Sequence, residues 1–248
     1  MLQYIIVCPL AFLAGFVDSI AGGGGLISLP AYIFAGIPIH FAIGTNKMSS
    51  CMGTIISTYR YAKDGYIKLK LGLLSAACAL IGSPIGATLS LKISDRYFKI
   101  LMLFILPITA FYVVNKSSLR DNKETLINYK TYAICMTIAF LVGIYDGFYG
   151  PGTGTFLILL LTGIAKLSLN TAAGTTKAIN LASNISGLIT FIISGKVILI
   201  LGLVAGIFSI LGNYMGAGYF TKSGVKVVRP VIIIVVAIFF VKLLLEIF

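Results

Sequence analysis

Two lysines and two aspartates are the first candidates for chemistry, because they interrupt sequence that is otherwise apolar. Lys47 and Lys177 lie inside hydrophobic stretches, and so do Asp18 and Asp146. Ionised side chains are costly inside a membrane, and they are found there mainly where they face a cavity or a partner. The ammonium groups suit a small anion, and the carboxylates suit proton transfer.

A polar stripe follows each lysine. Polar residues stand three and seven positions after both lysines, which places them on one face of a helix. We interpret each stripe as the wall of an aqueous or substrate-bearing cavity. The alternative is a lysine near a helix end, whose ammonium group reaches the membrane interface. The stripes are Lys47, Ser50 and Thr54, and Lys177, Asn180 and Asn184.

Glycine clusters interrupt two of the apolar stretches, at Gly22–Gly25 and at Gly150–Gly154. Glycine breaks a helix there, and an unpaired backbone inside a membrane is tolerated where it lines a cavity. Freed helix ends present N–H groups to an anion, whereas the alternative is close helix packing through small residues. The predicted substrate-binding residues are Gly22, Gly23, Gly24, Gly25, Asn46, Lys47, Ser50, Gly150, Gly152, Thr153, Gly154, Thr176, Lys177, Asn180 and Asn184.

The two aspartates occupy matching places, each four residues before its glycine cluster. Asp18 and Asp146 are candidates for proton coupling, since an intramembrane carboxylate in a polar cavity can titrate. Alternatively, each caps a broken helix by accepting hydrogen bonds from loose N–H groups. The two roles are compatible.

The composition places these residues in a membrane protein. Hydrophobic residues make up 58% of the chain and charged residues 10%, against about 25% charged residues in a typical soluble domain. Several mostly apolar stretches of 17 or more residues are long enough to cross roughly 30 Å of hydrocarbon. The sequence therefore predicts an all-α, polytopic integral membrane protein embedded in a lipid bilayer.

The chain contains an internal repeat. Residues 12–18 align with 140–146 at an offset of 128, and residues 44–47 align with 174–177 at an offset of 130. Glycines continue in step, with Gly82 matching Gly212 and Gly86 matching Gly216. We expect a first transmembrane repeat at 1–114, a polar connection at 115–128 and a second repeat at 129–248.

Each copy contains five apolar segments, of which the second is too short to be a certain span. Eight crossings would give parallel halves, and ten would give inverted halves. The segments are Leu2–Ile20, Leu26–Ile39, Ala42–Ala62, Leu69–Leu91, Tyr97–Val114, Tyr129–Tyr149, Thr155–Leu167, Thr171–Ser194, Val197–Tyr219 and Val227–Ile247.

Loop charges favour the inverted arrangement. With ten crossings, one side carries twelve loop Lys and Arg residues and the other side carries four. With eight crossings the split is nine to seven, which distinguishes nothing. Because basic residues concentrate on the cytoplasmic side, we expect ten segments in an inverted repeat with both termini outside.

Other classes of site find little support. The net charge of +12 comes mainly from short connections rather than from a basic face, so no nucleic-acid partner is predicted. The four cysteines lack metal-ligand spacing, and no metal or other cofactor is predicted. His40, in a short connection, is expected at the surface. Tyr59, Tyr61, Tyr149 and Tyr219, near segment ends, are expected at the membrane interface.

Two blocks of sequence carry a family resemblance. Residues 15–25 read Gly-Phe-Val-Asp-Ser-Ile-Ala-Gly-Gly-Gly-Gly, and Leu29-Pro30 and residues 44–47, Gly-Thr-Asn-Lys, follow. A weaker copy stands at residues 143–152. The blocks resemble the TauE/SafE (TSUP) family of sulfite and organosulfonate exporters. That family is usually drawn with a four-plus-four duplication, which differs from the arrangement that the loop charges favour.

The resemblance implies a multi-pass protein of the bacterial cytoplasmic membrane that moves sulfite, sulfonates or related sulfur-containing anions. The sequence contains no P-loop, so we expect a secondary transporter that moves small anions and draws its energy from an ion gradient. A passive anion channel is the alternative. No nucleophile with a base is apparent, so no enzyme is predicted.

Overall fold

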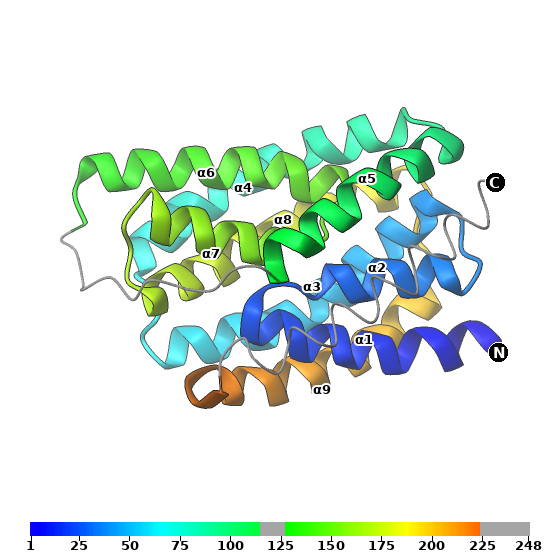
Figure 1. Cartoon of the computed structure of the whole chain (residues 1–248), viewed down its shortest axis with the longest axis horizontal. Coiled ribbons are helices and arrows are strands. Elements are labelled where there is room, and N and C mark those ends of the chain that lie inside the picture. The colour runs from blue at the N-terminus through cyan, green and yellow to red at the C-terminus, as the bar shows by residue number, and fades with distance from the viewer. Residues whose placement is uncertain (115–126, 224–248) are drawn as a thin grey trace.

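Helices are the only regular secondary structure among the described residues. The computed structural model describes residues 1–114 and 127–223, and these form nine helices and no strand (Figure 1). The all-α prediction is confirmed for these residues. The helices are α1 Leu2–Ala21, α2 Gly25–Phe34, α3 Ile39–Lys63, α4 Leu69–Leu91, α5 Asp95–Val114, α6 Tyr129–Phe148, α7 Thr153–Gly163, α8 Leu169–Ile193 and α9 Leu199–Ser223.

Five of these helices are long and apolar enough to cross a membrane: α1, α4, α6, α8 and α9. By contrast, α2 and α7 have 10 and 11 residues, so they extend only about 15–17 Å. They are shorter than the predicted segments Leu26–Ile39 and Thr155–Leu167. The predicted segment Val227–Ile247 and nearly all of the polar connection at 115–128 lie outside the described residues.

Glycines make the breaks that produce the short helices. Helix α1 ends where Gly22 adopts a left-handed backbone with φ of 73°, and Gly152 does the same before α7 with φ of 81°. Glycine reaches this region without the steric cost that a Cβ atom brings. Helices α1 and α6 are thereby each followed by a short helix, α2 and α7, at the predicted position.

The helices pack into two bundles, and each bundle contains one helix from the other half of the chain. Helix α9 packs against α1 and α3, whereas α4 packs against α6 and α8. The buried apolar residues follow the same grouping, since Leu201 and Ala205 of α9 join the cluster of α1–α3. We call α1, α2, α3 and α9 the first bundle, and α4, α6, α7 and α8 the second bundle.

Small residues allow the long helices to approach closely. Gly212 and Gly216 of α9 face the backbone of α1, where a Cβ atom would collide with the carbonyl groups of Phe12 and Phe16. On the other side, Gly82 and Gly86 of α4 face the backbone of α6. Close approach through glycine is a common basis of helix association in membranes, and these glycines serve packing.

Helices that match in the predicted repeat run in opposite directions along the long axis of the molecule (Figure 1). In Figure 1, α1 starts at the labelled N-terminus and runs against the direction of α6. Helices α3 and α8 likewise run opposite to each other, and they contact one another at the centre of the structure.

Three placements expected from the sequence are wrong. The His40 side chain is only 13% exposed, because it lies within α3 and its Nδ1 atom is 2.8 Å from the Asp95 carboxylate. Tyr61 and Tyr149 are 2% and 1% exposed, so neither side chain faces the surroundings of the protein. Both fill space beside the helix breaks, whereas Tyr59 and Tyr219 are exposed as expected.

Candidate functional site

A cavity of about 40 Å³ lies at the centre of the structure, between the helix breaks and the polar faces of α3 and α8. A buried water needs roughly 10–15 Å³ of such space, so the cavity accommodates a few waters or one small oxyanion. Predicted site residues supply much of its wall. Those on the wall are Asp18, Gly22, Gly24, Gly25, Asn46, Lys47, Ser50, Asp146, Gly150, Thr153, Gly154, Asn180 and Asn184.

Other wall residues were not predicted as site residues, and four predicted ones lie elsewhere. Gly23, Gly152, Thr176 and Lys177 do not line the cavity. The wall residues outside the predicted substrate-binding set are Ala11, Ala14, Gly15, Ser28, Ser49, Thr54, Ser209 and Asn213, of which Thr54 belongs to a predicted polar stripe. Ser209 and Asn213 come from α9, whose sequence shows no lysine-headed stripe, and the helix exchange between the bundles brings them to the site.

The first ion pair joins Lys47 of α3 to Asp146 of α6. The Lys47 ammonium donates to Oδ2 of Asp146, and the two side chains are 3% and 5% exposed. Both residues line the cavity. Lys47 belongs to the first bundle and Asp146 to the second, so this pair bridges the bundles across the cavity wall.

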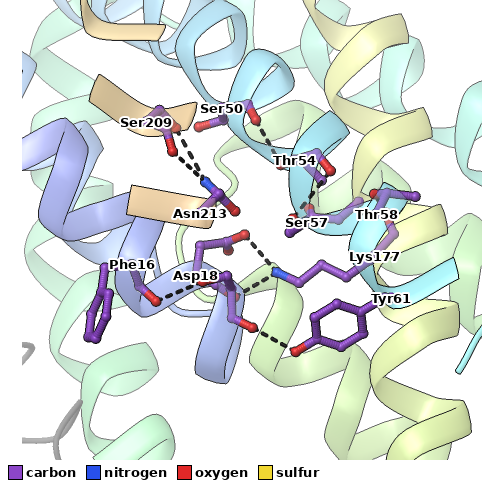
Figure 2. Close-up of polar contacts among 12 residues, drawn as sticks. Phe16, Asp18, Ser50, Thr54, Ser57, Thr58, Tyr61, Lys177, Ser209 and Asn213 are labelled. Carbon is purple, nitrogen blue, oxygen red and sulfur yellow. Dashed lines mark hydrogen bonds and ion pairs between the residues drawn. The ribbon is translucent and has the colours of Figure 1, made fainter. Parts of the chain in front are cut away.

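The second ion pair joins Lys177 of α8 to Asp18 of α1. The Lys177 ammonium lies 2.8 Å from Oδ2 of Asp18 and donates a second hydrogen bond of 2.6 Å to the Asp18 backbone carbonyl (Figure 2). Lys177 is buried behind Asp18 and does not reach the cavity. This pair also bridges the two bundles.

The lysines do not reach the membrane interface. Both are 2% exposed and both contact a carboxylate, so the alternative of ammonium groups extending to the headgroups is wrong. A buried charge is tolerated when it is paired and hydrogen-bonded. The two pairs together are electrically neutral, which makes the site less positive than two free lysines would be.

Asp146 has a second polar neighbour, the hydroxyl group of Thr153 at the start of α7. The Thr153 Oγ1 atom lies 2.9 Å from Oδ1 of Asp146 and 2.6 Å from the carbonyl oxygen of Gly150. A hydroxyl group has one proton to donate and two lone pairs to accept with. It can therefore donate to the carboxylate, or donate to Gly150 and accept a hydrogen bond from a protonated Asp146.

The end of α1 is held by hydrogen bonds from several elements. Gly22 donates its N–H to the carbonyl of Asp18 at 2.8 Å, and the Tyr61 hydroxyl donates to the carbonyl of Ser19 at 2.7 Å (Figure 2). Carbonyl groups at a helix C-terminus lack intrahelical partners, and these donors satisfy them. Lys177 thus acts as a cap on α1 as well as a partner for the Asp18 carboxylate.

The two breaks touch each other at Gly22 and Gly154. A Cβ atom on either residue would collide with the backbone of the other, and Thr155 donates its N–H to the Gly22 carbonyl at 3.2 Å. These two glycines serve close packing while also lining the cavity. Close packing and a place on the cavity wall therefore coincide at these two glycines.

Several N–H groups that were expected to face an anion bond to nearby carbonyls instead. In the first turn of α2, Leu26 donates to Gly23, and Ile27 and Ser28 donate to Gly24. At the start of α7, Thr153 donates to Gly150. The glycine breaks therefore leave fewer N–H groups available to an anion than the sequence indicated.

Asn213 presents an unpaired acceptor at the cavity wall. Its amide nitrogen donates to the backbone carbonyl of Ser209 at 3.0 Å, so its Oδ1 atom is left without a hydrogen-bond partner in the part of the chain that the structure describes (Figure 2). A buried acceptor without a partner is costly. A donor group on a bound molecule would satisfy it.

The chain matches the family described as "Sulfite exporter TauE/SafE" over residues 7–243. It is 34% identical over 247 residues to the "Probable membrane transporter protein ORF9" of Sinorhizobium sp., covering 99% of this chain and 93% of that relative. It is 35% identical over 237 residues to the "Probable membrane transporter protein YfcA" of Escherichia coli K12, covering 95% and 87%.

A more distant relative is the "Probable membrane transporter protein YdhB" of Bacillus subtilis, with 30% identity over 234 residues that cover 92% of this chain and 93% of the relative. No solved structure matches the chain. Together with the five long apolar helices, these relatives make the chain a multi-pass membrane protein with bacterial homologues.

Proposed function

Because the chain belongs to the TauE/SafE sulfite exporter family, we propose that it is a secondary transporter that exports small sulfur-containing anions such as sulfite or sulfonates. The three relatives are each named a probable membrane transporter, and the family description names sulfite. The observation that carries the proposal is the paired lysine at the cavity wall. Lys47 lines a central space sized for a small oxyanion, beside the amide-bearing Asn46, Asn180 and Asn184.

We further propose that the two halves form an inverted repeat, with residues 1–114 and 129–248 as the copies. The opposite directions of α1 and α6, and of α3 and α8, support this arrangement. In inverted repeats, each half can exchange roles with the other, and the binding site lies where they meet. Both ion pairs and the Gly22–Gly154 contact lie between the bundles, as such a mechanism requires.

Counterflow in proteoliposomes tests the transport proposal. Vesicles loaded with unlabelled sulfite or methanesulfonate should accumulate the labelled anion transiently, whereas protein-free vesicles should not. Lys47→Gln removes a charge-assisted hydrogen bond worth about 1.5–3 kcal/mol, so we expect the apparent affinity to fall roughly 10- to 100-fold. Lys70→Gln, on an exposed lysine at the start of α4, is the matched control and should behave like the wild type.

An anion channel would give a different result in the same vesicles. A transporter predicts saturable exchange, because each cycle carries a bound anion, and a channel predicts large currents without counterflow. Absence of counterflow for sulfite and for sulfonates, with Lys47→Gln indistinguishable from wild type, refutes the proposed function.

A further inference from the structure

We propose that the Lys47–Asp146 ion pair couples each transported anion to one proton, so that anion and proton cross the membrane together in the same direction. This inference rests on the proposed function and adds to it the sense of coupling and the residues that set it. It follows from three features of the site: the neutrality of the pair, its position on the cavity wall, and the second partner of Asp146.

The charge of the pair makes an anion alone a poor ligand. Lys47 and Asp146 neutralise each other, and both are almost fully buried. An anion that binds the Lys47 ammonium, beside the Asp146 carboxylate or in its place, gives this buried site one negative charge that no cation balances. Unpaired buried charge is strongly unfavourable. Binding therefore becomes favourable when a proton arrives with the anion.

The exchange balances in charge and in hydrogen bonds. A proton from water on the entry side joins the Asp146 carboxylate, the contact between Asp146 and Lys47 breaks, and a contact between Lys47 and the anion forms. The site is neutral before and after this step. On the other side of the membrane the anion leaves, the proton returns to water, and the ion pair re-forms.

Thr153 satisfies Asp146 in both states. Its Oγ1 atom lies 2.9 Å from Oδ1 of Asp146 and 2.6 Å from the Gly150 carbonyl. When Asp146 is ionised, the hydroxyl group can donate to it. When Asp146 carries the proton, the acid donates to Thr153 while Thr153 donates to Gly150, so each polar group keeps a partner.

The second pair is also neutral and Asp18 also lines the cavity, but its lysine and its hydrogen-bond partners differ, so we limit the coupling to one proton. The Lys177 ammonium also donates to the Asp18 backbone carbonyl at 2.6 Å, and a backbone carbonyl cannot take up a proton. Lys177 itself does not reach the cavity. The position that matches Thr153 in the predicted repeat is Gly25, which has no side chain. We therefore assign exchange to Lys47 and Asp146 and anchoring to Lys177 and Asp18.

Few charged groups lie near Asp146 in the described part of the chain. On the cavity wall they are Lys47 from α3 and Asp18 from α1, and Lys177 of α8 lies behind Asp18. The thiol of Cys51, one turn after Lys47, lies within electrostatic range of that lysine. Helices α2, α7 and α9 contribute uncharged groups to the wall: Ser28, Thr153, Ser209 and Asn213.

The sense of coupling has a consequence for direction. Symport with a proton means that an inward proton gradient drives uptake of the anion, and net export requires an anion gradient that points outward. Proton antiport would give the reverse. The two senses are thus distinguishable in one measurement.

The test uses purified full-length protein in vesicles that contain a pH-sensitive dye, with the membrane voltage clamped by potassium and valinomycin. Methanesulfonate is the probe, because it stays ionised at neutral pH and carries no proton by itself. An inward methanesulfonate gradient should acidify the lumen at about one proton per anion. The labelled flux should also be insensitive to the clamped voltage, since the loaded site is neutral.

Variants assign the coupling to one pair. Asp146→Asn mimics the protonated acid, so labelled methanesulfonate exchange should continue while proton movement falls at least roughly tenfold. Asp18→Asn should lower both fluxes together and keep their ratio, because it loosens the anchor rather than the exchange. Asp95→Asn, a half-exposed carboxylate beside His40, is the control and should leave the ratio unchanged.

The outcomes are distinguishable from failure of the proposed function. Methanesulfonate flux without acidification, with alkalinisation, or with voltage dependence in the wild type overturns the coupling and leaves transport intact. Retained proton movement in Asp146→Asn, or its selective loss in Asp18→Asn, overturns the assignment. No anion flux at all in the wild type refutes the proposed function and this inference with it. The wild-type measurements decide the matter even where a variant fails to fold.

Discussion

The lysines of the two ion pairs occur in similar stretches of sequence, but the two pairs have different surroundings. Lys47 makes one hydrogen bond within the described part of the chain, to a carboxylate on the cavity wall. Lys177 makes two, and one of them holds the end of α1. Residues that match in the predicted repeat therefore need not have the same role, because their neighbours differ.

The neighbours explain the difference. Tyr61 caps the end of α1 through its hydroxyl group, whereas the matching position in the predicted repeat is Phe191, which has no hydroxyl to offer α6. Conversely, Thr153 touches Asp146, and its counterpart near Asp18 is Gly25. The Lys177–Asp18 pair lies at a helix end that Tyr61 caps, and the Lys47–Asp146 pair lies beside a hydroxyl group that can hydrogen-bond Asp146 with or without its proton.

The largest expected difference concerns stability. Lys177→Met should destabilise the protein by about 3–5 kcal/mol, because it leaves a buried carboxylate unpaired and removes a helix cap. Lys47→Met should cost about 1–3 kcal/mol less, since Asp146 can be neutralised by a proton and retains Thr153. Thermal unfolding of the purified variants in detergent measures this. Equal shifts in the unfolding midpoint would contradict the distinction between the pairs.

The packing around the second pair depends on the contact between the two helix breaks. Gly22→Ala should destabilise through left-handed backbone strain of about 1–2 kcal/mol and through overlap with Gly154, which adds about 1–3 kcal/mol. Gly36→Ala is the matched control, with φ of +79° and no atom within 4 Å of the added Cβ among the described residues. Similar unfolding midpoints for the two variants would show that the overlap is relieved at no cost.

The smallest expected effect concerns the Tyr61 cap. Tyr61→Phe removes the hydrogen bond to the Ser19 carbonyl and should cost about 1 kcal/mol, measured by the same unfolding assay. Tyr59→Phe, on an exposed tyrosine of the same helix, should change the unfolding midpoint very little. If Tyr61→Phe leaves the midpoint unchanged, the capping difference between α1 and α6 does not stabilise the surroundings of the second pair.

Local features of the fold could be predicted with good accuracy. Predicted segment Leu69–Leu91 coincides with α4, and Leu2–Ile20 differs from α1 by one residue, because long apolar runs define membrane helices by themselves. The positions of both breaks follow from glycine chemistry in the same way. The length of α2 was overestimated, since Gly36 and Pro38 end the helical stretch before Ile39.

The candidate site was predicted in part. The polar stripes on α3 and α8 point inward, because helical spacing fixes which residues share a face. Asn213 was missed, since nothing in the local pattern of α9 shows that this helix packs against the opposite half. A buried asparagine between glycines 212 and 216 was the signal available, as an intramembrane amide needs a partner.

The sequence by itself determined that the chain enters a membrane, where its helices break and which four charges lie inside. These are local properties, set by apolar length, glycine and helical periodicity. Only the tertiary structure decided that Lys47 meets Asp146, 99 residues away, and that Lys177 meets Asp18, 159 residues away. Such partners depend on the packing of helices that are distant in the sequence, such as α3 against α8, because this packing brings together side chains whose spacing carries no local pattern.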